Sequence, residues 1–250
     1  MRGYPATRQK HCLCFFLFFS LIMFLPLSQS RAGDFWQINS LSFLHGSDYK
    51  LGEATRNIMT YEHTDGWKYG DTFFFTDLSF LDENKTEYYA ELQPRFSLSK
   101  ISGKKFSYGM VDDILIATQM EFGSHDVRTY LYGLGADLKI PGFTFLNVEA
   151  YVRDNAYLPG ATYQFTTAWD RPFVIANSKW TITGFVDWAG GEDQLSSNVI
   201  AAPQLLLDIG NYWNLPGKLY GGIEYQYWHN KFGVHGVDEH APQAMVKFFF

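Results

Sequence analysis

The sequence predicts an all-β fold, a closed antiparallel transmembrane β-barrel of about twelve strands. Three observations support this prediction. Many segments alternate apolar and polar residues, aromatic residues make up 18% of the chain, and the mean hydropathy is only −0.17. After residue 32 there is no apolar run of the ~20 residues that a membrane-spanning helix needs. High aromatic content with near-neutral hydropathy is typical of a lipid-facing barrel, in which polar inner residues alternate with apolar outer ones.

Residues 1–32 have the features of a cleaved signal peptide. Basic residues precede an almost wholly apolar stretch at 13–25, and small residues flank Arg31, with cleavage expected before Gly33. The apolar stretch is shorter than a spanning helix, so a membrane anchor is the less favoured alternative. Both cysteines fall in this segment. We therefore expect residues 33–250 to form one outer-membrane barrel domain that contains no disulfide.

The segment from Tyr88 to Leu98 shows the alternation most clearly. One face carries Tyr88, Ala90, Leu92, Pro94, Phe96 and Leu98. The other face carries Tyr89, Glu91, Gln93, Arg95 and Ser97. A carboxylate, an amide and a guanidinium on one face do not suit an apolar core. They suit a wet barrel lumen.

The same period-2 pattern recurs along the chain. Clear segments are 128–139, 144–153, 179–188, 203–209 and 219–228. Weaker ones are 35–44, 56–64, 67–77, 113–122 and 162–170, with a tight hairpin turn expected at Asp65-Gly66. Twelve strands leave about 18 residues for each strand with its connection, against spans of ~9–11 residues. Sixteen strands would leave about 14 residues for each strand with its connection, too few for long loops. Eight strands would leave about 27 residues and would leave several clearly alternating segments outside the barrel wall.

The last segment, 243–250, alternates up to Phe250. Phe250, Phe248, Val246 and Ala244 form an apolar row, and Lys247 and Gln243 lie on the other face. We expect this strand to close the barrel against the strand near Trp36, with lipid covering its apolar row. The terminal aromatic residue resembles the signature by which the barrel-assembly machinery recognises outer-membrane barrels.

The predicted inner rows supply aromatic rings, carboxylates and cations that could line a solute path. The candidates are Glu62, Tyr89, Glu91, Arg95, Asp137, Glu149, Tyr151, Arg153, Phe185, Asp187, Tyr220, Glu224 and Trp228. For each residue the alternative is a structural one, because inward charges in small barrels also form ion-pair networks that hold the wall. Outward Tyr130, Tyr132, Trp180, Trp188, Tyr225 and Tyr227 suit the aromatic girdle at the membrane surface.

Short motifs in a fixed order extend over nearly the whole chain after residue 32. They are Arg56-Asn57 with Thr60-Tyr61-Glu62; Gly66-Trp67-Lys68-Tyr69-Gly70-Asp71; Phe73-Phe74-Phe75; Glu91-Leu92-Gln93-Pro94-Arg95-Phe96-Ser97; Tyr132-Gly133-Leu134-Gly135; Pro141-Gly142-Phe143; Asn147-Val148 with Tyr151; Arg153-Asp154-Asn155; Gly184-Phe185-Val186-Asp187-Trp188; and Gly222-Ile223-Glu224-Tyr225 with Tyr227-Trp228. This ordered set resembles the nucleoside-specific channel-forming outer-membrane proteins of the Tsx type, and the OmpK branch most closely.

The resemblance implies a monomeric twelve-stranded barrel in the bacterial outer membrane that passes nucleosides and deoxynucleosides down their gradient. It also implies that some members serve as phage or colicin receptors. Outer-membrane lipids are the expected surroundings, no cofactor or metal is expected, and the chain is expected not to be an enzyme. The formal net charge of −6 argues against nucleic acid as a partner.

Two alternatives to the channel remain open. One is a surface receptor or adhesion barrel, in which loops dock a phage or toxin. The other is an outer-membrane lipid hydrolase, which would need a serine and a histidine near one membrane surface on the lipid-facing side. A cluster of His235, Asp238, Glu239 and His240 lies in a glycine-bearing stretch, without a fixed geometry for a metal.

Overall fold

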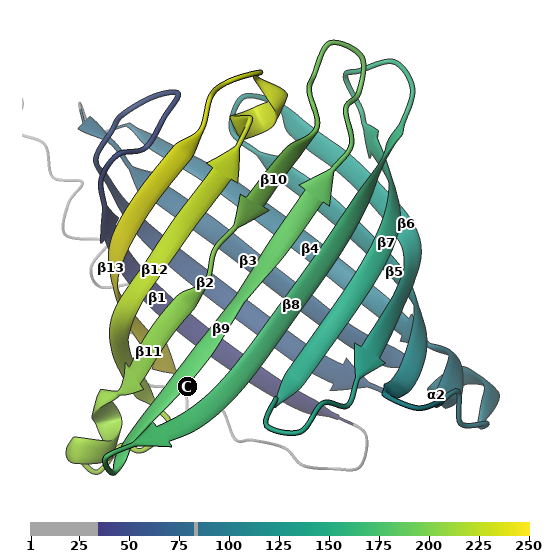
Figure 1. Ribbon diagram of the computed structural model, residues 1–250, viewed down its shortest axis with the longest axis vertical. Helices are drawn as coiled ribbons and strands as arrows, with labels where there is room; N and C mark the ends of the chain where they lie inside the picture. The colour runs from purple at the N-terminus through teal and green to yellow at the C-terminus, as the bar shows by residue number, and fades with distance from the viewer. Residues whose placement is uncertain (1–34, 83–84) are drawn as a thin grey trace, which may run out of the picture. The chain divides into compact units, whose positions relative to one another are not determined.

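The computed structural model describes residues 35–82 and 85–250. The predicted signal segment, residues 1–32, lies outside the described residues. The described chain forms one closed antiparallel β-sheet, as predicted (Figure 1). Its strands are β1 (Trp36–Gly46), β2 (Arg56–Trp67), β3 (Gly70–Phe80), β4 (Thr86–Ser97), β5 (Val111–Gly123), β6 (Val127–Leu138), β7 (Phe145–Asn155), β8 (Thr162–Ile175), β9 (Ser178–Ala189), β10 (Asn198–Ala201), β11 (Gln204–Asp208), β12 (Leu219–His229) and β13 (Glu239–Phe249). Among these residues no helix is long and apolar enough to cross a membrane.

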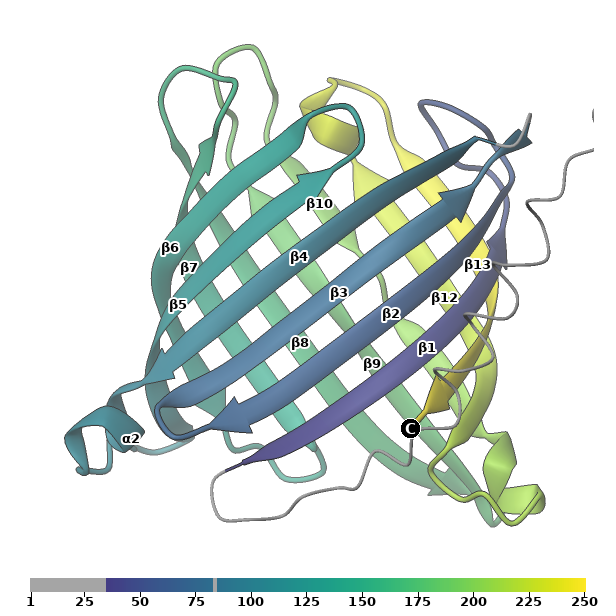
Figure 2. The ribbon, with the colours of Figure 1, turned by 180° about the vertical axis from the view of Figure 1, so that it is seen from behind.

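Strands that follow each other in the chain pair with each other, except β10 and β11, and β13 returns to pair with β1, as Figure 2 shows from behind. In this closing pair Ser42 lies opposite Lys247 and Phe43 lies opposite Val246. The pairing of the last strand with the strand that begins at Trp36 confirms the predicted closure. Because every strand has two neighbours, the barrel leaves no edge whose backbone groups would lack partners in lipid.

Thirteen strand segments occupy twelve positions in the wall. Both β10 and β11 pair with β9 on one side and with β12 on the other. The interruption falls at Ala202-Pro203, where proline has no backbone N–H to donate. Gly184 lies opposite this break with φ +144, and a Cβ there would lie 2.5 Å from the carbonyl oxygen of Ala202. A glycine is therefore required at this point of the wall.

The two ends of the barrel are called upper and lower as they appear in Figure 1. The lower end holds the start of β1, the end of β13, the short helix α2 (Leu98–Ser102) and the 3-10 turn η2 (Ile209–Tyr212). The upper end holds the connections after β1, β7, β9 and β12, including the 3-10 turn η3 (Lys231–Gly233).

Burial in this barrel is inverted relative to a water-soluble protein. Leu134 and Ile223 on the outer face are 60% and 56% exposed, whereas Gln164 and Lys247 on the inner face are 2% and 6% exposed. Neighbouring residues alternate between the two faces in every strand, because β side chains point to opposite sides in turn. An outer wall of this kind is stable only where acyl chains cover it.

The predicted hairpin turn at Asp65-Gly66 is wrong. Both residues lie within β2, where they pair with β1 and β3, and the turn follows at positions 68–69. A Cβ on Gly66 would lie 2.1 Å from Nε1 of Trp36. Glycine at this position therefore allows the indole ring of Trp36 to lie close to the backbone. The prediction was wrong because glycine is also common in turns.

Candidate solute path on the inner wall

Arg95 on β4 is the centre of a charged cluster on the inner wall. Its Nε lies 2.8 Å and its Nη2 lies 3.0 Å from the two oxygens of Asp71. Its Nη1 lies 2.9 Å from Asp137 and 3.1 Å from Glu149. One planar guanidinium thus holds three carboxylates from β3, β6 and β7 together, and two of its bonds form the paired geometry that arginine makes with a carboxylate. We call these four residues the Arg95 cluster.

A second network runs across the inner wall from β5 to β9. Arg153 donates to both oxygens of Glu121 at 2.5 and 2.7 Å and to Gln164 at 2.7 Å. Gln164 then donates to Thr166 at 3.1 Å, and Thr166 donates to Asp187 at 2.7 Å. This chain of bonds links the charged groups of β5, β7 and β9 to one another through the neutral side chains of β8.

Glu91, four residues before Arg95 on the same face, has different partners. It accepts hydrogen bonds from Tyr89 at 2.7 Å, from Gln93 at 2.6 Å and from Gln119 at 2.9 Å. None of these three donors carries a charge. Glu91 therefore lies on the inner wall as an acceptor held in place by neutral groups.

Other inner carboxylates share this neutral environment. Each accepts from a hydroxyl or amide: Asp77 from Thr60, Asp170 from Thr181, Asp187 from Thr166, and Glu224 from Gln204 and Gln243. The inner wall thus has two kinds of carboxylate, one neutralised by arginine or lysine and one held by neutral donors.

An ion pair also spans the closing strands. Glu62 on β2 pairs with Lys247 on β13 and accepts from the Ser40 hydroxyl at 2.5 Å. Lys247 was an inner-face candidate in the sequence, and its side chain is only 7% exposed. Glu62 is therefore one of the carboxylates whose charge is neutralised by a basic side chain.

Three aromatic rings line the wall beside Glu91. The rings of Phe73 and Phe75 have centroids 5.9 Å apart, and Phe75 lies 5.9 Å from Tyr89. Phe75 is opposite Glu62 on β2 and opposite Glu91 on β4, so it shares their inner face. We call Phe73, Phe75 and Tyr89 the aromatic strip.

Sequence reasoning missed two members of this strip. The segment 67–77 had no assigned inner face, because Phe73, Phe74 and Phe75 are consecutive and alternation cannot separate them. The signal that resolves them is the register of β3 against the charged rows of β2 and β4.

All thirteen residues proposed from the sequence lie on the inner face. Seven belong to the networks already described: Glu62, Glu91, Arg95, Asp137, Glu149, Arg153 and Asp187. Tyr89 belongs to the aromatic strip, and Glu224 is held by two amides. Tyr151 is 4% exposed and packs against Ala117 and Leu131. Phe185 follows from the alternation of β9, and Tyr220 packs edge-on against Phe249 at 5.5 Å.

Trp228, the last of the thirteen, belongs to a cluster at the upper end. The Lys231 ammonium lies 2.5 Å from Glu239, with side chains 2% and 0% exposed, and within 6 Å of the rings of Trp228, Phe232 and Tyr49. Burial lowers the pKa of Lys231, while the bond to Glu239 opposes that shift. Burial also raises the pKa of Tyr49. The ring of Trp228 therefore packs against Lys231 and Phe232 of the loop that follows β12.

Two histidines on the outer face have amide partners. His45 Nδ1 lies 2.9 Å from Asn57, and His63 Nδ1 lies 2.8 Å from Asn39. No hydrogen bond within residues 35–82 and 85–250 joins a serine to a histidine. In the same part of the chain, no group of three or more His, Cys, Asp or Glu residues could hold a metal ion.

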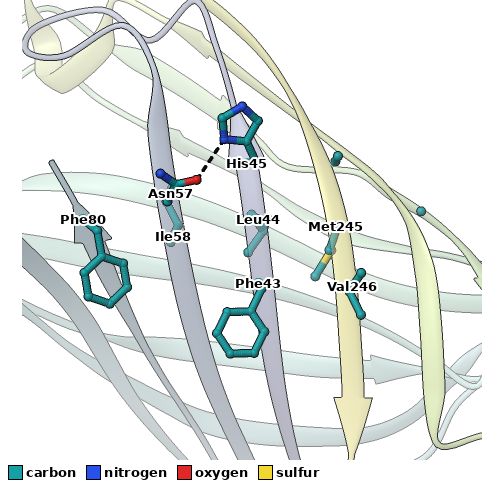
Figure 3. A pocket seen from close by; sticks show the side chains of 10 residues that line it. Phe43, Leu44, His45, Asn57, Ile58, Phe80, Met245 and Val246 are labelled. Carbon is teal, nitrogen blue, oxygen red and sulfur yellow. Dashed lines mark hydrogen bonds between the residues drawn. The ribbon is translucent and has the colours of Figure 1, made fainter. Parts of the chain in front are cut away.

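A pocket of about 380 Å³ lies around His45, near the upper end of β1 (Figure 3). Six of its ten lining residues face outward by strand alternation: Phe43, His45, Asn57, Phe80, Ala244 and Val246. The other four, Leu44, Ile58, Gly222 and Met245, face inward, but none of the ten belongs to the charged networks of the inner wall.

A family model described as "Nucleoside-specific channel-forming protein, Tsx" matches residues 40–245. The chain belongs to the Tsx family. An outer membrane protein OmpK of Vibrio parahaemolyticus is 28% identical over 151 residues, which are 58% of this chain and 51% of that protein. A second OmpK, from serotype O3:K6 (strain RIMD 2210633) of that species, is 24% identical over 152 residues, which are 57% and 51% of the two chains. The aligned region spans about half the length of these relatives.

These relatives confirm the predicted OmpK branch and place this Tsx-family chain in the bacterial outer membrane. Among solved structures, the KdgM porin covers 84% of this chain and 99% of its own, with a TM-score of 0.51 and 11% sequence identity. The same porin "in complex with disordered oligogalacturonate" gives a TM-score of 0.50 at 11% identity. At this identity the likeness shows a shared barrel fold. Family and fold are those of outer-membrane channels.

Proposed function

We propose that this Tsx-family barrel is a passive channel for nucleosides and deoxynucleosides. The observation that carries the proposal is the aromatic strip beside Glu91 on the inner wall. A nucleoside has a flat base and a hydroxyl-bearing sugar. It therefore needs a ring surface and a hydrogen-bond acceptor close together.

The strip supplies the surface for the base. Stacking of a base on an aromatic side chain is worth ~1–3 kcal/mol and tolerates different bases. Three rings in succession, with centroid spacings of 5.9 Å, would let a base move from one ring to the next. Weak, repeated binding of this kind suits a channel, because a solute must also leave.

Glu91 supplies the acceptor for the sugar. Its donors Gln93 and Gln119 are neutral, so a ribose hydroxyl could replace one of them without breaking an ion pair. The carboxylates of the Arg95 cluster lack this freedom, because release of one of them would leave a buried charge unpaired. We therefore assign the solute path to the wall near β3 and β4 and the bracing of the wall to the Arg95 cluster.

Conductance in planar bilayers tests the proposal. The barrel should conduct ions, and added adenosine or thymidine should block that current in a saturable way, whereas glucose at the same concentration should not. The double variant Phe73→Leu, Phe75→Leu should conduct but lose the nucleoside block. Phe74→Leu, on the outer face of the same strand, is the matched control. Absence of conductance, or a current that nucleosides do not alter, would overturn the channel proposal and favour a receptor barrel.

A further inference from the structure

The two ends of the barrel carry opposite exposed charge. Among residues 35–82 and 85–250, the exposed cations of the lower end are Lys68, Lys100, Lys104, Lys105, Lys139, Arg171 and Lys179, and Asp112 is the exposed carboxylate there. The exposed carboxylates of the upper end are Asp48, Asp82, Asp126, Asp193 and Asp238, with Lys50, Lys85 and Arg128 as exposed cations. A basic rim at one end attracts anions to that end.

Large apolar side chains lie beside these cations in the connection that contains α2. Ile101, Phe106, Tyr108 and Met110 are 51%, 39%, 90% and 65% exposed. Figures 1 and 2 both show this connection projecting sideways, beyond the barrel wall at the lower end. Its residues therefore lie over the surrounding membrane rather than over the mouth of the barrel.

The connection is continuous with the lipid-facing wall. Trp67 lies edge-on to Phe96 at 5.4 Å and to Tyr69 at 6.5 Å, and these rings form part of the outer face just above α2. Lys100 donates to the carbonyl oxygens of Trp67 and Gly70, which ties the start of the connection to the barrel. Aromatic residues at this position lie at the level of lipid headgroups.

We propose that this lower rim binds anionic phospholipid headgroups. Lys104 and Lys105 contact lipid phosphates, and Phe106, Tyr108 and Met110 insert among the glycerol and upper acyl groups. Lys104 makes no ion pair among the described residues, and Lys105 lies 3.8 Å from the exposed Asp112. Both ammonium groups can therefore reach a phosphate. The combination of cations with exposed aromatic and aliphatic side chains is the chemistry of a segment that lies in the membrane surface.

Native mass spectrometry of the full barrel tests whether Lys104 and Lys105 bind anionic lipid. The protein is placed in vesicles with equal phosphatidylglycerol and phosphatidylcholine, extracted in detergent, and its retained lipids are counted. Each lysine near an anionic membrane surface strengthens binding roughly fivefold. The variant Lys104→Gln, Lys105→Gln should therefore lower the ratio of retained phosphatidylglycerol to phosphatidylcholine by roughly thirtyfold. The matched control is Lys50→Gln, Arg128→Gln, which removes the same charge from the upper end and should leave the ratio unchanged.

Fluorescence tests whether the side chain at position 108 inserts into the membrane. A Tyr108→Trp variant should be quenched by lipids brominated near the glycerol end of their acyl chains. Phosphatidylglycerol retention that falls equally in both double variants, or does not fall in either, would overturn the lipid-binding rim. A tryptophan at position 108 that brominated lipids do not quench would overturn it too. Binding of a soluble acidic protein without lipid selectivity would assign the rim to a protein partner instead.

Discussion

Two glutamates on the inner wall, Glu149 on β7 and Glu91 on β4, show how this barrel uses the same chemistry in two ways. Glu149 is held by Arg95 at 3.1 Å, together with Asp71 and Asp137. Glu91 is held by a phenol and two amides and has the aromatic strip beside it. The first arrangement fixes four strands together, and the second leaves an acceptor that a solute could engage. In the channel that we propose, the charge of the partners distinguishes residues that brace the wall from residues that contact the solute, although both of these are glutamates on the same inner face.

The largest expected effect is the loss of the Arg95 cluster. Arg95→Met should lower the free energy of unfolding by about 3–5 kcal/mol, because it leaves three inner carboxylates without their cation. Denaturant unfolding in lipid micelles, followed by the gel shift of the folded barrel, measures this change. Arg95→Lys keeps the charge but loses the paired geometry, so its stability should lie between that of the unsubstituted protein and that of Arg95→Met. An unchanged midpoint for Arg95→Met would contradict a bracing role.

The next effect concerns the aromatic strip. Phe75→Leu should weaken nucleoside block of the current by ~1–3 kcal/mol, roughly tenfold in concentration, because one stacking surface is lost. Stability should change little beyond that of Phe74→Leu on the outer face. A fall in conductance without a change in nucleoside affinity would instead make Phe75 a wall residue.

Glu91→Gln should have a smaller effect, confined to the sugar. It replaces one carboxylate oxygen by an amide NH2 group, which cannot accept a hydrogen bond, and one hydrogen bond contributes ~0.5–1.5 kcal/mol. We expect about a fivefold loss in nucleoside affinity and no change for a free base, which lacks the hydroxyls. Titration of the current with a nucleoside and with its base measures both. Equal losses for the two solutes would contradict a sugar contact at Glu91.

The smallest effect is expected at Thr166, which links Gln164 to Asp187. Thr166→Val should cost about 1 kcal/mol of stability, because one hydrogen-bonded link in the inner network is lost. Thermal unfolding in micelles measures it, and Thr167→Val on the outer face is the comparison, because it removes only a hydrogen bond to the carbonyl oxygen of Asn147. If nucleoside block weakens while stability does not change, Asp187 contacts the solute rather than bracing the wall.

The sequence alone predicted the barrel and most of its inner face because side-chain alternation is local. In β4 and β7 the two faces differ in polarity, so Glu91, Arg95 and Glu149 could be placed without a structure. In β3 both faces carry phenylalanine, and Phe73 and Phe75 became visible only through the register with β2 and β4. The prediction of a turn at Asp65-Gly66 was wrong because the glycine makes room for the ring of Trp36 on the neighbouring strand. A local sequence pattern does not reveal such a contact.

The partners of each inner charge were beyond sequence reasoning. Arg95 and Glu149 are separated by two intervening strands, and strand tilt decides which side chains meet. The sequence therefore indicated which residues face inward, whereas the partners of each residue came only from the structure.

The pair of Glu62 and Lys247 has a consequence for how the barrel is assembled. It crosses the seam between the first and last strands, which are separated by almost the whole chain. Contacts of such high sequence separation form late, since the chain between them must first be ordered. Until then β1 and β13 are two open edges, able to pair with other strands. The Glu62–Lys247 ion pair can form only once the seam has closed, and it then favours the correct register of β1 against β13.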